Sequence, residues 1–232
     1  MASVDRSVIA DMPLFNGFGP GQLDSVLSGA RSVRYPKGSA VFEQDGEAHS
    51  FFLLLHGRLR VVRLTPDGQQ VVVRFVNPGD IFGIAKAIGR DTYPGTAIAA
   101  VDSVALLWPS SLWPELVAAH PALAVNTVQT MGARIQEAHT RVVEMSTEEV
   151  ERRVAHALLR LANQAGHKVG DGIEIAFPIS RQDIAEMTGT TLHTVSRILS
   201  GWEGAGLVRS GRQRVVIREP HKLFMVAEGS EG

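Results

Sequence analysis

The sequence contains no cysteine among its 232 residues. This absence excludes structural disulfides, thiolate zinc sites, redox thiol switches and cysteine-ligated iron–sulfur clusters. The sequence also lacks any apolar run approaching the roughly 20 residues that a membrane-spanning helix needs, and its N-terminus lacks a charged start followed by an apolar core. We therefore expect a cytoplasmic protein with no membrane partner.

An excess of positive charge is absent as well, since the formal net charge is −1 at pH 7. A whole-chain sum hides local patches, however, and residues 190–218 carry five arginines against the single acid Glu203, a local net charge of +4. Groupings typical of catalysis are also missing. Asp80, Glu115, Glu137 and the histidines lie scattered, without nucleophile, metal-ligand or phosphate-loop spacing. We therefore expect no enzyme.

The most informative stretch is 181–200, where small and apolar residues fall at the crossing of two predicted helices. Ala185 is small where the two helix axes approach, and Gly189 can adopt the left-handed conformation of a tight turn. Ser180 followed by Asp183 predicts a capping box for the first helix. The pattern predicts a helix-turn-helix, although an ordinary helical hairpin would share it.

The second helix of this pair has one apolar and one polar face. Thr191 is its predicted cap, and Val195 and Ile198 point inward. The outward stripe occupies positions i, i+1, i+4 and i+5, which hold Leu192, His193, Ser196 and Arg197. In a helix-turn-helix such a stripe faces the DNA major groove.

Residues 207–217 predict two short strands around a turn at Ser210-Gly211. This hairpin carries Arg209, Arg212 and Arg214 and is typical of a basic wing. A recognition helix beside such a hairpin predicts a winged helix-turn-helix and disfavours the ordinary helical hairpin.

Between residues 33 and 107, short apolar strands alternate with turn residues. The clearest strands are predicted over 51–55, 58–64 and 70–76. The turns are Pro36-Lys-Gly38, Asp45-Gly46, Gly57, Pro66-Asp-Gly68 and Asn77-Pro-Gly79. This spacing predicts an antiparallel barrel or roll, preceded by short helices at 13–15 and 22–27.

After Pro121 the apolar period becomes that of a long helix. Residues spaced alternately by three and four form a seam of Val128, Met131, Ile135, Ala138, Val142 and Met145. We interpret the seam as a homodimer interface, because one recognition helix contacts only a few base pairs, whereas a two-fold pair reads half-sites about 34 Å apart. The alternative is a helix that packs on its own barrel.

Ser146 followed by Glu149 predicts a second capping box, where the long helix ends and a new one begins. We place the domain boundary there. The predicted domains are a sensor β-roll with short N-terminal helices over 1–120, a dimerisation helix over 121–145 and a winged helix-turn-helix over 146–232. Within the last we expect a loop over 166–172 and a strand over 173–179. The fold class is α+β.

This order of elements resembles the Crp/Fnr superfamily of bacterial transcription regulators. The strongest resemblance lies in Lys37-Gly38, Gly79-Asp80, Ser180-Arg-Gln-Asp-Ile-Ala185 and Thr194-Val-Ser-Arg-Ile-Leu199. It implies a cyclic-nucleotide-binding-like β-roll (a jelly roll) that senses a signal, a long dimerisation helix and a DNA-binding winged helix-turn-helix. It also implies a homodimer whose partners are a palindromic operator in double-stranded DNA and RNA polymerase.

Departures from the family pattern bear on the signal. In cyclic-AMP-binding members the segment after Gly83 carries a glutamate for the ribose and an Arg-Ser pair for the cyclic phosphate, where this chain has Ile84 and Pro94-Gly95. Without the arginine fork the phosphate loses its bidentate partner, and we expect nearby Arg90 to be an exposed loop residue. We therefore expect no cyclic AMP. The family's iron–sulfur oxygen sensing is excluded by the absence of cysteine.

Residues 190–197 resemble the recognition helix of NnrR-type regulators, which respond to nitric oxide, and this resemblance allows haem as a cofactor. A histidine is a natural axial ligand, and the candidates are His49, His56, His120, His139, His156, His167, His193 and His221. His139 is favoured, because cyclic-AMP-binding members place hydroxyl residues against the ligand in this stretch. We expect an effector pocket around His139, Gly83 and Ile84. The alternative is that His139 flanks the seam and binds nothing.

The family match also assigns roles in DNA binding. Arg197 stands where members place an arginine that pairs with guanine O6 and N7, and Ser196 stands where FNR-like proteins place a serine near bases. His193 departs from the glutamate of many members and donates or accepts through one nitrogen at a time. Phosphate contacts are expected from Thr191, Thr194, Arg209, Arg212 and Arg214.

One rival class is a regulatory module without DNA binding, in which the helical tail docks on a protein partner. The basic wing and the polar stripe favour DNA. A salt-dependent shift of a palindromic operator would distinguish the two classes.

Overall fold

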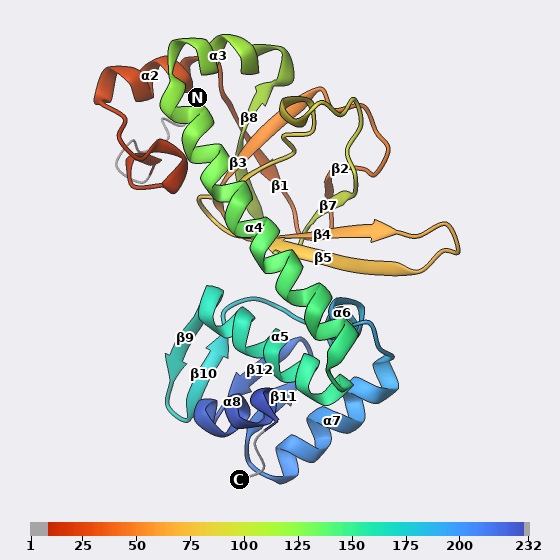
Figure 1. Ribbon diagram of the computed structural model, residues 1–232. Coiled ribbons are helices and arrows are strands. Elements are labelled where there is room, and N and C mark those ends of the chain that lie inside the picture. Colours follow the sequence, from red (N-terminus) through yellow and green to blue (C-terminus); the bar gives the residue numbers. More distant parts are fainter. Residues whose placement is uncertain (1–8, 230–232) are drawn as a thin grey trace. The chain divides into compact units, whose positions relative to one another are not determined.

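The computed structural model describes residues 9–229, which form two compact units (Figure 1). The first extends to residue 137 without 70–72, and the second comprises 70–72 and the chain from residue 138. Among the described residues, no helix is long and apolar enough to cross a membrane.

The first unit contains the predicted roll, built from two four-stranded sheets. One sheet has the order β1 (Arg31–Tyr35), β8 (Ser103–Pro109), β3 (Ser50–His56) and β6 (Ile81–Phe82). The other has the order β2 (Ala40–Phe42), β7 (Thr96–Ala99), β4 (Leu59–Leu64) and β5 (Gln70–Val76). The predicted strands over 51–55, 58–64 and 70–76 are thus confirmed as β3, β4 and β5.

Strand β3 is buried on both faces, because alternate side chains of a strand point to opposite sides of its sheet. Phe51 and Leu53 join a core formed with helices η1 (Pro13–Phe15), α2 (Pro20–Ser28) and α3 (Trp113–Ala119). Phe52 and Leu54 face the roll interior instead. There the rings of Phe52 and Phe82 stack with centroids 5.1 Å apart. The expected helices at 13–15 and 22–27 are confirmed, and they cover the outer face of β3.

Helix α4 (Pro121–Thr147) begins where predicted and packs one face on the roll. Leu123 is buried in the core beneath the N-terminal helices. Asn126 Nδ2 donates to the Leu14 carbonyl at 2.9 Å, and Arg134 Nη2 donates to the Ile81 carbonyl at 2.7 Å. These contacts confirm, for this face of α4, the alternative in which the helix packs on its own roll.

The opposite face of α4 leaves large apolar side chains exposed. They are Val125, Val128, Ile135, Val142, Val143 and Met145, each at least half exposed. Four seam residues are among them, whereas Met131, which we placed in the seam, packs half-buried against the first unit's core. Packing on the roll is therefore confirmed for one face of α4, and the homodimer interface stays a prediction for the exposed apolar residues.

The capping box predicted at Ser146 and Glu149 is wrong. Ser146 Oγ donates to the Val142 carbonyl at 2.8 Å inside α4, a local bond that serine readily makes in the last turn of a helix. Helix α5 (Val150–Ala165) follows Glu149, which makes no side-chain cap. Arg153 ties the first turn of α5 to the linker, since its Nη1 donates to the carbonyl of linker residue Glu148 at 2.8 Å.

The second unit contains a four-stranded sheet of order β11 (Val208–Gly211), β12 (Arg214–Ile217), β10 (Gly172–Ile175) and β9 (Gly166–Val169). Helix α8 (Pro220–Glu228) follows the sheet. The prediction of a loop over 166–172 is wrong, because 166–169 form β9. The sequence of β9 lacks the alternation of apolar and polar residues that predicts a strand. The strand expected over 173–179 ends early at Ile175. The wing turns at Arg212-Gln213, not at Ser210-Gly211, and Gln213 adopts a φ of 60°.

Two turn glycines of the roll make a matched test of packing. Gly57 has a φ of +91°, and a Cβ there would lie 2.6 Å from the Asp102 carbonyl oxygen. Gly68 has a φ of +83° with nothing within 4 Å of its Cβ position. We predict that Gly68→Ala lowers the free energy of unfolding by about 1–2 kcal/mol through backbone strain alone. Gly57→Ala should cost about 3 kcal/mol or more, because a backbone clash adds to the strain.

Urea unfolding of both variants measures this difference. Equal losses would show that the close approach at Gly57 is relieved without cost, contrary to the packing described.

Candidate nucleic-acid interface

The helix-turn-helix consists of α6 (Arg181–Thr188) and α7 (Leu192–Gly204). The predicted capping box is confirmed in both directions: Asp183 N donates to Ser180 Oγ at 3.0 Å, and Ser180 N donates to Asp183 Oδ2 at 2.8 Å. Gly189 ends α6 with a φ of +63°, as expected for a residue in the left-handed region. The buried Ala185 side chain confirms its predicted place at the helix crossing.

The start of α7 presents two hydroxyl groups. Thr194 N donates to Thr191 Oγ1 at 3.1 Å, which confirms the predicted cap, and the two threonine hydroxyls lie 2.9 Å apart. Thr191 is exposed and Thr194 half-buried. Backbone N–H groups at a helix N-terminus favour anions, so this end of α7 suits a phosphate contact.

One face of α7 is buried. Val195, Leu199 and Trp202 lie in the core of the unit, with at most 5% of each side chain exposed. Trp202 Nε1 donates to Glu151 Oε1 on α5 at 2.8 Å. This packing fixes the rotation of α7 about its own axis, because turning the helix would expose an indole and break its hydrogen bond.

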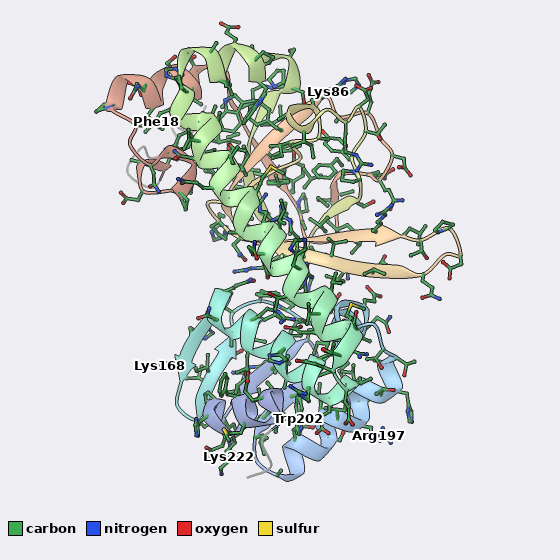
Figure 2. The ribbon with its side chains drawn as sticks, viewed as in Figure 1. Phe18, Lys86, Lys168, Arg197, Trp202 and Lys222 are labelled. Carbon is green, nitrogen blue, oxygen red and sulfur yellow. The ribbon has the colours of Figure 1, made fainter. Side chains whose placement is uncertain are left out.

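The predicted outward stripe follows from that rotation. Leu192, His193 and Arg197 are exposed and Ser196 is half-buried, and Figure 2 shows Arg197 on the outer side of α7. No acidic partner of Arg197 occurs among the contacts of the described residues. Arg197 therefore presents a guanidinium ready to pair with a base edge.

The wing is less basic than its sequence predicts. Arg214 forms a fork with both oxygens of Glu174, and Arg209 Nη2 lies 3.0 Å from Asp171 Oδ1. Arg218 Nε lies 3.5 Å from the second Asp171 oxygen. The local charge of +4 counted along the chain is thus wrong as a description of the surface. The two acids lie outside the counted stretch and reach the arginines across the sheet.

Arg181, at the first position of α6, was not predicted to contribute. Its Nη2 donates to Ser210 Oγ at 2.9 Å and lies 3.7 Å from Glu203 Oε2. Glu203 Oε1 in turn accepts from Ser210 N at 2.6 Å. This network joins both helices of the motif to the first wing strand. The sequence carried one signal for this network, because Glu203 is the single acid in the basic stretch 190–218. Such an acid commonly has a cationic partner.

The proposed effector residues fall in different surroundings. Gly83 has a φ of +67°, and a Cβ there would lie 2.8 Å from the Phe52 ring. Ile84 is buried in the core beneath the N-terminal helices. Both are packing positions of the first unit. Gly83 has no side chain to offer a ligand, and the Ile84 side chain is taken up by the core.

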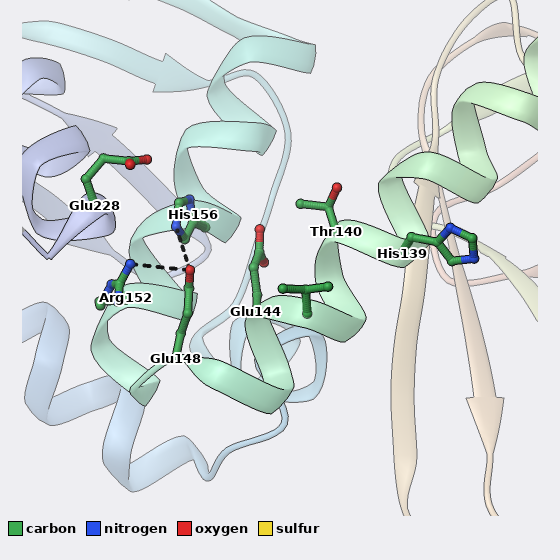
Figure 3. Close-up of a pocket in the computed structure, with 8 residues that line it drawn as sticks. His139, Thr140, Glu144, Glu148, Arg152, His156 and Glu228 are labelled. Atoms are coloured by element: carbon green, nitrogen blue, oxygen red, sulfur yellow. Dashed lines mark hydrogen bonds and ion pairs between the residues drawn. The ribbon is translucent and has the colours of Figure 1, made fainter.

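His139 belongs to the second unit, where it borders a cavity of about 380 Å³ (Figure 3). The other lining residues are Thr140, Val143, Glu144, Glu148, Arg152, His156 and Glu228. Glu148 Oε1 lies 3.4 Å from His156 Nε2 and 3.5 Å from Arg152 Nη2, whereas the imidazole of His139 points away from this cluster. Among the described residues, no three histidine or acidic side chains are grouped to hold a metal ion.

Comparison with known proteins matches both units to families. Residues 32–120 match the cyclic nucleotide-binding domain, and residues 152–224 match the Crp-like helix-turn-helix domain. The chain is 30% identical to the cyclic AMP receptor protein of Thermus thermophilus, over 94% of this chain and 97% of that protein.

Regulators named for other roles are also similar. The nitrogen fixation regulation protein FixK of Bradyrhizobium diazoefficiens is 26% identical over 85% of this chain and 82% of its own. The structure of FixK2 from Bradyrhizobium japonicum superposes with a TM-score of 0.74 at 25% identity, covering 85% of this chain and 96% of that one. With two family domains in the family's order and a relative that matches along nearly its whole length, the chain belongs to the Crp/Fnr family of DNA-binding transcription regulators.

Proposed function

We propose that the protein acts as a homodimer that binds a palindromic operator through α7 and regulates transcription in response to a signal sensed by the roll. The observation that carries this proposal is the outward stripe of α7, in which Arg197 is exposed beside His193 and Ser196. RNA polymerase is the further partner that this role requires.

Sequence readout is assigned to the stripe. An arginine that pairs with guanine O6 and N7 contributes about 1–3 kcal/mol of discrimination against another base. A neutral His193 presents one hydrogen-bond donor and one acceptor. It therefore suits a different base edge from that of cytosine, from which a glutamate at this position would accept a hydrogen bond. Thr191 and Thr194, at the N-terminus of α7, are assigned to phosphates.

The apolar face of α4 supports the dimer. Val128 is 68% exposed and Ile135 is 51% exposed, on a helix whose other face already packs on the roll. A contiguous exposed apolar stripe on a helix marks a contact surface, and spacings of three and four suit a coiled coil with a second copy. The alternative function, a regulatory module that docks on another protein without binding DNA, does not explain the polar stripe of α7.

Cyclic AMP is named for the Thermus relative, but the residues of this chain argue against it as the effector. Pro94 and Gly95 replace the arginine and serine that would hold the phosphate, and a Cβ at Gly95 would lie 2.8 Å from the Val62 carbonyl oxygen. The rings of Phe42 and Tyr93 stack at 3.9 Å within the roll. We infer that the roll responds to another signal.

Haem, suggested by the NnrR-like recognition helix, does not fit the residues around His139. The imidazole is exposed, and the cavity that it borders is lined by the carboxylates of Glu144, Glu148 and Glu228. Ligand sites are mostly apolar, whereas Val143 is the single apolar residue in this lining and Glu148 is already paired with Arg152 and His156. The proposal therefore assigns no haem to His139, and a nitric oxide response would need a different site.

Arg197→Ala and Arg212→Ala should separate base readout from phosphate attachment. We predict that Arg197→Ala loses about 1–3 kcal/mol at one base position of each half-site and relaxes preference there. Arg212→Ala should weaken binding to all sequences alike and reduce the salt slope by about 0.9 per protomer. Titrations on an operator selected from a random pool, and on its point-substituted versions, measure both. A uniform loss for Arg197→Ala would contradict its assignment.

Ile135→Glu tests the dimer. Each dimer would bury two unpaired carboxylates, so we predict at least about a 100-fold increase in the dimer dissociation constant, with loss of operator binding. Gln129→Glu, an exposed polar position on the same helix, is the control and should leave the dimer intact. Sedimentation equilibrium reports the mass of each variant. A dimer unaffected by Ile135→Glu would place the interface elsewhere.

Cyclic AMP should change neither the operator affinity nor the heat signal in calorimetric titration of the wild-type protein. Saturable binding of cyclic AMP would contradict the interpretation of Pro94 and Gly95.

A further inference from the structure

The ion pairs of the wing form one cluster on one face of the sheet. The register pairs Arg209 with Val216 and Val216 with Glu174, so these three side chains lie in a row across β11, β12 and β10. Arg214, two residues before Val216, lies on the same face. Arg214 Nε and Nη2 approach the two Glu174 oxygens at 2.6 and 2.5 Å.

The carboxylates are held closer to the protein than the guanidinium groups. Only 16% of the Glu174 side chain is exposed, against 56% for Arg214. Asp171 is 37% exposed and serves both Arg209 and Arg218. The arginines therefore face solvent from the outer side of the cluster, where a DNA phosphate would approach them.

The pairing also shifts the pKa values of both partners in the direction that favours their charged forms. The hydrogen bond from Arg214, together with the charges of Arg214, His167 and Arg209, lowers the pKa of Glu174. The hydrogen bond to Glu174 raises the pKa of Arg214. Glu174 thus stays ionised and keeps its arginine partner throughout the pH range in which the protein would bind DNA.

An arginine already forked to a carboxylate has to exchange that partner before it can pair with a phosphate, because both bind the same guanidinium edge. Each free arginine that neutralises a phosphate releases condensed counterions, and this release supplies nearly all of the sequence-independent affinity for DNA. Arg197 and Arg212 have no such acid among their described contacts, whereas Arg209, Arg214 and Arg218 each have one.

We propose that Asp171 and Glu174 limit the sequence-independent attachment of this protein to DNA by holding Arg209, Arg214 and Arg218 in ion pairs, so that Arg197 decides where it binds. The inference rests on the DNA binding proposed above. Weaker sequence-independent attachment leaves more of the protein available to occupy its operator in the cell, because a genome offers about 10⁶–10⁹ competing non-specific sites.

Glu174→Gln is the direct test, since it keeps the shape of the side chain and removes its charge. On a random-sequence duplex about three helical turns long, the variant should bind about three- to tenfold more tightly at ~0.15 M salt, with a salt slope steeper by about 0.9 per protomer. Glu219→Gln is the control: it removes the same charge from an exposed residue that makes no side-chain cap and has no arginine partner among the described contacts.

The double variant Glu174→Gln/Arg214→Gln should return to wild-type affinity for the random duplex, because the released arginine is then missing. Asp171→Asn, which releases Arg209 and Arg218, provides a second route if Glu174→Gln does not fold, and it should bind more tightly as well. A Glu174→Gln variant no tighter than Glu219→Gln would overturn the proposal. A double variant that keeps the whole gain would overturn it too.

The same titrations include the wild-type protein on an operator selected from a random pool. If the wild type prefers that operator and Glu174→Gln behaves as Glu219→Gln does, only the ion-pair inference fails. If the wild type shows no preference for any selected sequence, the proposed regulatory function fails, whatever Glu174→Gln does on random duplexes.

Discussion

The burial of one face of α7 in the core of the second unit is the interaction on which the DNA-binding unit depends. Val195, Leu199 and Trp202 are buried, and the Trp202 indole donates to Glu151 at 2.8 Å. Because a helix has only one rotation that buries these three side chains, the stripe containing Arg197 has to face outward. The left-handed Gly189 ends α6 and Thr191 caps the start of α7, so sequence-local features and tertiary packing converge on one orientation.

Local features of the fold could be predicted from the sequence, whereas pairings across a sheet could not. Caps, turns and apolar periodicity depend on residues a few positions apart, which is why α6, α7 and the roll strands were expected correctly. Strand β9 was not predicted because its sequence Gly-His-Lys-Val does not alternate between apolar and polar residues. The acids that partner the wing arginines were missed because nothing local to Asp171 or Glu174 reveals that β10 pairs with β12. Ser146 is not a cap because it lies inside α4, which runs to Thr147, and its hydroxyl donates to the Val142 carbonyl within that helix.

Helix α4 combines an anchored side with an exposed apolar side, to which we assign the proposed dimer contact. Its roll-facing side is anchored by Leu123, Asn126 and Arg134, and its opposite side exposes Val128 and Ile135. Fold and the DNA-binding domain are shared with the relatives. The fold alone does not set the signal, and our proposal of a signal other than cyclic AMP rests on Pro94 and Gly95.

The central claim is that two copies of α7 read DNA as a symmetric pair. Selection of bound duplexes from a random-sequence pool by the purified wild-type protein tests it most directly. The account predicts enrichment of an inverted repeat whose half-site centres lie about one helical turn, ~34 Å, apart. Enrichment of no sequence, or of a single asymmetric half-site, would contradict it.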